Sequence, residues 1–314
     1  MVHATTPRVR GASLSCVLPL LLFCCCAATT AASDSPPADA RSSAPLPRPE
    51  TYDLRVAFAP EDQHMTGRAV VGFPPDAAAA DSLVFFLHGE LSVDSLTCGG
   101  VPVAFAETAV VYAYDYSLLA RRVAVALDDH DLAAGLTVRY SGFFHRSGAR
   151  SPSDYMRIDA DGVFLRSYGY SLWLPVFVPA GAESHDLRHV AMEVSVPDGF
   201  TTVAVGTCVD RRRERERRVS RWRAVDVNLL DLQITARPYR VIREGPVHLY
   251  VTEDAAGATA AAGIATFVAR LDSIYGEWYG AADHRDQLHV MQMPRYGDIA
   301  SGNTRSRDNE GHAH

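Results

Sequence analysis

Between residues 50 and 237, apolar and polar side chains alternate in short segments, which is the pattern of strands with one buried face. In the first segment, Tyr52, Leu54 and Val56 alternate with Asp53 and Arg55. Further predicted strands cover residues 67–73, 82–87, 91–96, 101–105, 122–127, 136–140, 173–178, 189–196, 201–207, 221–229 and 232–236. Turns rich in Asp, Gly and Pro separate them, so we expect a mainly β domain, an antiparallel sandwich or open layer rather than βαβ units.

The pattern changes near Pro238. Residues 247–252 form another alternating segment, and Asp254 is positioned to cap a helix. Apolar residues then recur at helical spacing over about seven turns, at Ile264, Phe267, Val268, Leu271, Ile274, Tyr275 and Trp278. Gly276 or Gly280 is expected to end this helix, and a strand over residues 288–293 follows. Residues 238–303 therefore predict the start of an α/β domain, whose helical stripe is expected to pack against a larger sheet.

Residues 1–32 have the features of a secretory signal. Arg8 and Arg10 precede an apolar stretch from residue 14 to 28, and small residues follow it. Export to the periplasm, the exterior or a membrane surface is therefore expected. Lipidation within Cys24–Cys26 and an uncleaved anchor stay open as alternatives, and they are the only membrane contact that the sequence predicts. Residues 33–49, rich in Ser, Pro and Ala, are expected to form a linker.

Composition and charge limit the classes of binding partner that the sequence predicts. The chain has 314 residues, 47% of them hydrophobic, and a net charge of −7, which gives no reason to expect nucleic acid. Residues 210–223 contain eight arginines and two glutamates. They suggest a polyanion-binding patch or a solvated hairpin tip, and the lack of aromatic residues other than Trp222 favours the tip. After signal removal only Cys98 and Cys208 remain, and the sequence leaves their pairing open.

The sequence offers no convincing metal site. His185 and His189 would share one face of a helix, but alternation from residue 188 to 196 indicates a strand, where positions four apart are about 13 Å apart. Residues 304–314 form a polar tail ending in His312 and His314, for which disorder is the expectation. The zinc-binding pattern H-E-x-x-H is absent from the 314 residues.

Several segments, in order, carry a family resemblance. They are an opening Y-x-L-x-V strand, then Gly67, FFLHGELSV from residue 85, TVRYSG ending at Gly142 before two phenylalanines, WLPVF, VSVPDGFTTVAVG ending at Gly206, and MPRYGDIASGN. In this order they resemble the N-terminal part of zinc aminopeptidases of the alanyl-aminopeptidase type (peptidase family M1). The resemblance implies a saddle-like β domain followed by a thermolysin-like catalytic domain with one zinc ion and peptide substrates.

The resemblance also suggests a substrate-binding site. The segment from Leu288 resembles the family's substrate-cradling edge strand, and its loop implies contacts from Gly297, Ala300, Ser301, Gly302 and Asn303. Of the family's G-x-M-E-N loop only Asn303 matches, so the carboxylate that holds a substrate's amino group is missing. No catalytic or metal-binding residue is assigned, and zinc is implied only for a full-length relative. Two functions remain: the N-terminal fragment of an exported metallopeptidase, inactive as this chain, or a secreted, non-catalytic β-sandwich binding module.

Overall fold

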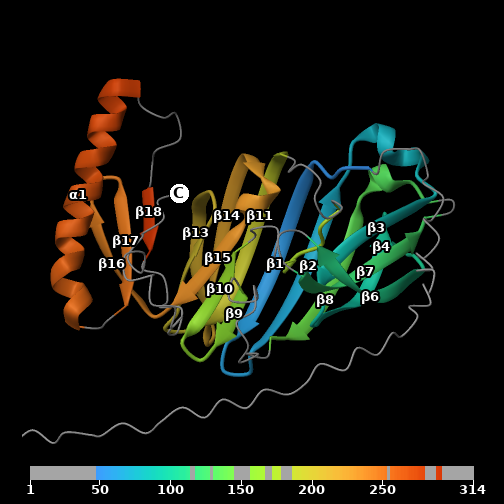
Figure 1. Cartoon of the computed structure of the whole chain (residues 1–314), viewed down its shortest axis with the longest axis horizontal. Coiled ribbons are helices and arrows are strands. Elements are labelled where there is room, and N and C mark those ends of the chain that lie inside the picture. Colours follow the sequence, from blue (N-terminus) through green and yellow to red (C-terminus); the bar gives the residue numbers. More distant parts are fainter. Residues whose placement is uncertain are drawn as a thin grey trace, which may run out of the picture. The chain divides into compact units, whose positions relative to one another are not determined.

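The computed structural model describes residues 47–113, 117–127, 130–144, 156–166, 172–177, 186–252, 255–279 and 288–291. The chain is mainly β, with several antiparallel sheets, which confirms the predicted fold class (Figure 1). Predicted features at residues 1–46, 185 and 292–314 lie outside the described residues. No helix among the described residues has the length and apolar character needed to cross a membrane.

An eight-stranded sheet is the largest element. In spatial order it contains β13 (Thr207–Glu214), β14 (Arg217–Asn228), β11 (Asp186–Pro197), β1 (Thr51–Ala59), β2 (His64–Gly72), β8 (Leu136–Phe143), β4 (Leu91–Cys98) and β5 (Val101–Pro102). All neighbours pair antiparallel except β1 and β11, which are parallel although they lie far apart in the sequence. Gly67 lies opposite Tyr140, and a Cβ at this position would come within 2.2 Å of the Tyr140 ring, so only glycine fits there.

Three smaller sheets complete the described strands. One has the order β12 (Thr201–Ala204), β15 (Gln233–Arg237), β10 (Gly162–Arg166), β9 (Met156–Asp159), and another the order β3 (Ser82–His88), β7 (Ser117–Ala126), β6 (Phe105–Ala113). The third contains β16 (Tyr239–Glu244), β17 (Val247–Thr252) and β18 (Leu288–Met291), with helix α1 (Ala255–Tyr279) between β17 and β18 in sequence. Short 3-10 turns occur at Pro75–Ala79, Leu132–Ala134 and Leu229–Asp231.

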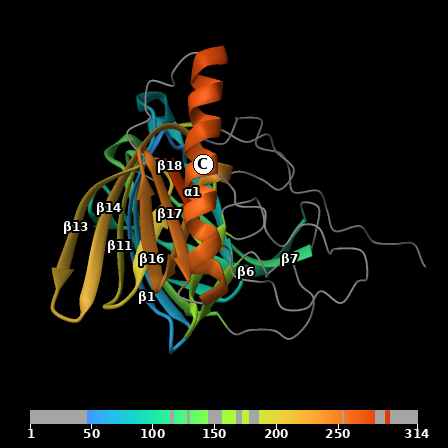
Figure 2. The same cartoon turned by 90° about the vertical axis from the view of Figure 1, so that its left-hand side faces the viewer.

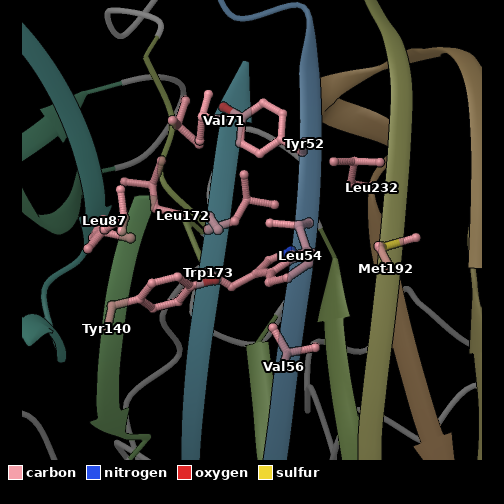
Figure 3. Packing of buried hydrophobic residues seen from close by; sticks show 14 of the residues in the cluster. Tyr52, Leu54, Val56, Val71, Leu87, Tyr140, Leu172, Trp173, Met192 and Leu232 are labelled. Atoms are coloured by element: carbon pink, nitrogen blue, oxygen red, sulfur yellow. The ribbon is translucent and has the colours of Figure 1, made fainter. Parts of the chain in front are cut away.

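One continuous core joins the inner face of the eight-stranded sheet to the smaller sheets, and it reaches the third of these through Tyr239, Tyr250 and Met291. Leu54 and Val56 of β1 belong to this core together with Leu172, Trp173 and Leu232, and Leu54 is seen beside Trp173 (Figure 3). Trp173 and Leu54 are completely buried. Full burial of such side chains contributes about 2–3 kcal/mol each, which makes this core the main source of stability.

The segment around Trp173 corrects one strand prediction. Residues 173–177 are buried, but they pair only through a single bridge between Val176 and Phe86 of β3. The Tyr52 hydroxyl also donates to the Pro175 carbonyl at 2.9 Å. The apolar run therefore reflects burial between two sheets, which looks the same in sequence as a strand.

Other strand predictions differ in detail. Residues 101–105 are not one strand, because β5 ends at Pro102 and β6 starts at Phe105. Strands β9, β10 and β16 were not predicted, since short segments with few alternations give little signal. Most of β6 was missed as well, because the predicted strand ended at Phe105. The arginine-rich segment is not merely a hairpin tip: it forms most of β13 and part of β14, and the turn is limited to Arg215 and Glu216.

Helix α1 confirms the predicted helix but not its packing face. It runs from Ala255 to Tyr279, so Gly276 lies inside it. Among its side chains whose burial is described, residues 261–278, the fully buried ones are Ala261 and Ala265. Of the predicted stripe, Val268 packs against this small core, whereas Phe267 and Trp278 are 60% and 71% exposed. The helix packs on β17 and β16, a sheet with one strand more than predicted (Figure 2). The domain boundaries at 237 and 303 stay predictions.

Candidate functional site

Strand β18 lies at the edge of its three-stranded sheet. It pairs in parallel with β17, and the Leu288 N–H donates to the Pro246 carbonyl at 2.8 Å. Both main-chain groups of a residue in a parallel strand point to the same side, and the side alternates along the strand. His289 and Met291 therefore direct their N–H and C=O groups to the open edge. Among the described residues, no strand pairs with this edge.

The two faces of the β17–β18 pair carry different side chains. Val247, Leu249, Val251 and Val290 face the helix and form a small apolar core with its alanines. Tyr250 and His289 belong to the opposite face and are 0% and 5% exposed. The alternation of a strand thus gives β17 and β18 one apolar side and one side with buried polar groups.

The second face meets the outermost strands of the eight-stranded sheet. We call Cys208, Arg211, Trp222, Tyr250 and His289 the junction cluster. Arg211 Nε donates to Cys208 Sγ at 3.2 Å, and its Nη2 donates to the Tyr250 hydroxyl at 3.2 Å. The Tyr250 hydroxyl lies 2.9 Å from His289 Nδ1. The Trp222 ring lies 5.5 Å from the imidazole of His289 and 5.6 Å from the guanidinium of Arg211. The junction cluster therefore ties β17 and β18 to β13 and β14.

Hydrogen-bond chemistry assigns the imidazole tautomer. A guanidinium can only donate, so the Tyr250 oxygen accepts from Arg211 and its single proton goes to His289 Nδ1. The remaining proton of the neutral ring then sits on Nε2, which is buried and has no hydrogen-bond partner within the described part of the chain. Burial lowers the pKa of His289 to about 4, and the neighbouring His248 and Arg211 lower it in the same direction. His289 is therefore neutral at pH 7.

The junction cluster is suited to positioning rather than to catalysis. Cys208 contacts Arg211, and the Tyr250 hydroxyl links Arg211 to His289, so the cluster pairs no nucleophile directly with a base. The imidazoles of His248 and His289 lie 5.5 Å apart. Within the described ranges, no three His, Cys, Asp or Glu side chains are grouped so that they could hold a metal ion. These residues therefore do not fit a zinc site, which needs at least three protein ligands.

None of the predicted site residues can be compared with the structure. Gly297, Ala300, Ser301, Gly302 and Asn303 all lie outside the described residues. Four residues of the predicted strand, Leu288–Met291, are confirmed as a strand.

The structure also describes several other residues that the sequence analysis considered. His189 is an exposed residue of strand β11, as the alternation predicted, and His185 is not described. Cys98 and Cys208 are free thiols, and Cys98 Sγ donates to the Asp131 carbonyl at 3.3 Å. Gly142 packs against the Glu90 carbonyl, where a Cβ would come within 2.2 Å of the oxygen.

The sequence interpretation missed the junction cluster. Its members come from three separate segments, and although Trp222, Tyr250 and His289 stood in predicted strands, no local pattern connects these strands. The sequence signal was weak: in β17 an aromatic residue, Tyr250, stands between the apolar residues where a solvated face would carry a charged one. A strand with polar side chains on a buried second face predicts contact with another layer.

The fold is that of M1 zinc metallopeptidase domains. A two-domain M1 zinc metallopeptidase bound to L-arginine matches with a TM-score of 0.53 and 18% identity, over 79% of this chain and 58% of that chain. An M1 zinc metallopeptidase from Deinococcus radiodurans matches with a TM-score of 0.52 and 17% identity, over 78% and 56%. A mutant from the same organism, bound to a Tyr-Ser-Ala substrate, matches equally well at 18% identity. No protein-family description and no curated protein matches the chain in sequence. The chain thus spans somewhat more than half the length of these metallopeptidases, and at this identity the likeness concerns the fold.

Proposed function

We propose that this chain is the N-terminal part of an exported M1-type metallopeptidase, in which the β layers hold strand β18 in place for binding an extended peptide. The observation that carries the proposal is the open edge of β18 on a fold shared with M1 zinc metallopeptidases. An extended peptide can add to such an edge through main-chain hydrogen bonds. The predicted substrate loop, which includes Gly302 and Asn303, follows this strand in the sequence.

The junction cluster supports a positioning role for the β layers. The unpaired main-chain groups belong to His289 and Met291, and the His289 side chain is held by Tyr250. Arg211 and Trp222 then hold these two rings against the eight-stranded sheet. A peptide on the edge would therefore meet a strand whose position is fixed from behind.

This proposal implies that the chain does not hydrolyse peptides by itself. Its 314 residues lack H-E-x-x-H, and a zinc ion is implied only for a full-length relative. Purified full chain is expected to contain substoichiometric zinc and to release no amino acid from aminoacyl chromogenic substrates. One zinc per chain together with hydrolysis would overturn this part of the proposal.

Peptide binding can be tested at the edge itself. Met291→Pro removes an N–H that faces the open edge and leaves the Leu288 bond to β17 in place. A Tyr-Ser-Ala tripeptide, titrated into the full chain and followed by NMR, is expected to bind weakly to the natural sequence and to the control Met291→Leu. Binding is expected to be lost in Met291→Pro. Equal binding by both variants would contradict recognition at the β18 edge.

Export rests on the N-terminal sequence alone. Arg8, Arg10 and the following apolar stretch favour a cleaved signal ending near residue 32. Mass spectrometry of the secreted protein should find a new N-terminus close to Ser33. A chain that starts at Met1 or carries lipid at Cys24–Cys26 would favour the anchored alternatives.

The second candidate is a secreted, non-catalytic binding module. Two open grooves on the outer face of the eight-stranded sheet favour it, one lined by Arg55, Arg68 and Arg139 and the other by Asp53 and Arg223 among others. This candidate predicts ligand binding that is unaffected by Met291→Pro. A downstream reading frame encoding H-E-x-x-H would favour the metallopeptidase instead.

A further inference from the structure

Three arginines stand side by side on the outer face of the eight-stranded sheet. The register places Arg55 of β1 beside Arg68 of β2, and Arg68 beside Arg139 of β8. Residues directly opposite each other on neighbouring strands have Cβ atoms about 5 Å apart, and like charges at such positions destabilise the sheet. Arg55 and Arg139 are exposed, and Arg68 is half-buried. We call these three residues the arginine row.

Two neighbouring arginines, Arg212 and Arg221, are neutralised by Glu193, and the arginine row has no such carboxylate partner among the described residues. Glu193 lies beside Arg55 in the register, but its Oε2 accepts from Arg221 Nε at 2.7 Å and from Arg212 Nη2 at 3.2 Å. Partial burial acts to raise the pKa of Glu193, and these two arginines outweigh it and hold that pKa below its usual value. Arg217 in turn donates to Ser195. Across the described ranges, no carboxylate comes within 4.0 Å of a guanidinium nitrogen of the arginine row.

The arginine row lines an open groove of about 490 Å³. Beside it runs a row of small residues, because Ala57 lies opposite both Ser195 and Thr66 in the register. Long arginine stems next to this small-residue row leave space for a ligand. Asp94 also lines the groove, and its Oδ1 accepts from Ser141 Oγ at 2.9 Å. Since Glu193 and Asp94 lie toward opposite ends, a ligand anion is favoured in the middle, over Arg68.

Guanidinium groups recognise oxyanions particularly well. Each offers two parallel N–H donors that match the oxygens of a carboxylate or phosphate, and such charge-assisted bonds are about twice as strong as neutral ones. A compact anion with several oxygens could accept from more than one member of the row. It would also remove the repulsion among three adjacent cations. A monovalent anion such as chloride lacks the geometry to do this.

We propose that Arg55, Arg68 and Arg139 form a binding site for a multivalent oxyanion, a ligand that carries two or more phosphate or carboxylate groups. The site lies on the outer face of the eight-stranded sheet and uses none of the main-chain groups of the β18 edge. It is therefore independent of the proposed peptide binding.

Calorimetric titration of the full chain with pyrophosphate and, separately, with citrate tests the site, with ionic strength held constant by NaCl. The natural sequence is expected to give a one-site isotherm with at least one of the two ligands. Arg68→Gln is expected to weaken that affinity by about tenfold or more, because it removes charge-assisted hydrogen bonds. The matched control is Arg215→Gln, which removes the same charge from the exposed turn between β13 and β14. Arg215 lines neither groove, so this variant is expected to change affinity by no more than about twofold.

The outcomes distinguish a phosphate-type from a carboxylate-type ligand, and specific binding from a general effect of net charge. Binding of pyrophosphate alone assigns a phosphate-type ligand, and binding of citrate alone assigns a carboxylate-type ligand. No isotherm with either ligand overturns the proposal. Equal weakening by Arg68→Gln and Arg215→Gln also overturns it, because a general effect of net charge would then explain the binding. If circular dichroism shows that Arg68→Gln does not fold, exposed Arg139→Gln replaces it with the same expected loss.

Discussion

The two-layer β core and the β17–α1–β18 unit are stabilised in different ways. The core that contains Trp173, Tyr52 and Phe85 is built from large side chains that are almost fully buried. The β17–α1–β18 unit has a small core of its own, to which helix α1 contributes mainly Ala261 and Ala265, while Phe267 and Trp278 remain exposed. Stabilisation scales with the apolar area removed from water, so the unit depends on its few contacts with the large core, among them Tyr250 and Met291, and on the junction cluster. The comparison predicts that the unit opens before the core unfolds.

The largest expected effect comes from matched leucine substitutions. Leu54→Ala removes a fully buried side chain from the large core and is expected to lower the free energy of unfolding by about 3 kcal/mol. Leu249→Ala is expected to affect global unfolding less and to expose residues 239–291 to protease first. Leu119→Ala, at a position that is 70% exposed, is the control and should stay within about 0.5 kcal/mol. Urea titration and limited proteolysis measure both effects, and equal protease resistance of the two regions would contradict the comparison.

Acid is expected to destabilise both regions through two buried histidines. Burial lowers the pKa of His88 and of His289 to about 4, below the unfolded value of 6.5. The unfolded chain therefore binds more protons between these pH values, so stability is present above pH 6.5 and falls as the pH drops toward 4. Each histidine can lower the free energy of unfolding by up to about 3 kcal/mol between pH 7 and pH 4.

The two histidines can be separated by substitution. His88→Phe is expected to flatten the pH dependence of global unfolding, because His88 lies in the large core. His289→Phe is expected to flatten the pH dependence of protease cleavage in the β17–α1–β18 unit. Hydrogen exchange between pH 7 and 4 can follow both. If neither variant changes the pH dependence, other groups determine the acid sensitivity.

A smaller effect is expected at the junction cluster. Arg211→Met removes the hydrogen bonds to Cys208 and to the Tyr250 hydroxyl. Because Arg211 is solvent-exposed, screening limits the lost stabilisation to about 1 kcal/mol. The loss should lower the free energy of opening of the β17–α1–β18 unit. Arg215→Met, in the exposed hairpin turn, is the control and should leave hydrogen exchange of β17 unchanged. An unchanged exchange rate in Arg211→Met would show that the cluster does not hold the unit.

The smallest effect is expected on the exposed side of helix α1. Phe267 is 60% exposed, so Phe267→Glu should change stability by less than about 0.5 kcal/mol and increase solubility. Ala265→Glu places a charge in the fully buried contact with β17 and is the contrasting variant, expected to release the helix. Circular dichroism and hydrogen exchange distinguish the two. A larger loss in Phe267→Glu than in Ala265→Glu would restore the packing face expected from the sequence.

How well a feature could be predicted depended on how local it was. The alternation around Leu54 and the apolar period around Leu271 lie within single segments, so β1, β17 and α1 followed from the sequence. The run at Trp173 was misjudged because burial on all sides removes the alternation that distinguishes a strand. The candidate site was predicted only as far as strand β18, since its loop residues lie outside the described residues.

The sequence by itself determined the mainly β class and the helix, because periods of 2 and 3.6 residues follow from backbone geometry alone. The expectation that β18 is an edge strand came from the family resemblance and not from its period. The tertiary structure decided which side of α1 is buried, since the small side chains of Ala261 and Ala265 let the helix approach β17 closely. It also decided the parallel pairing of β1 with β11 and the contact of His289 with Tyr250. These partners lie far apart along the chain, and local pattern carries no information on which distant segments meet. Only the packed sheets bring them together.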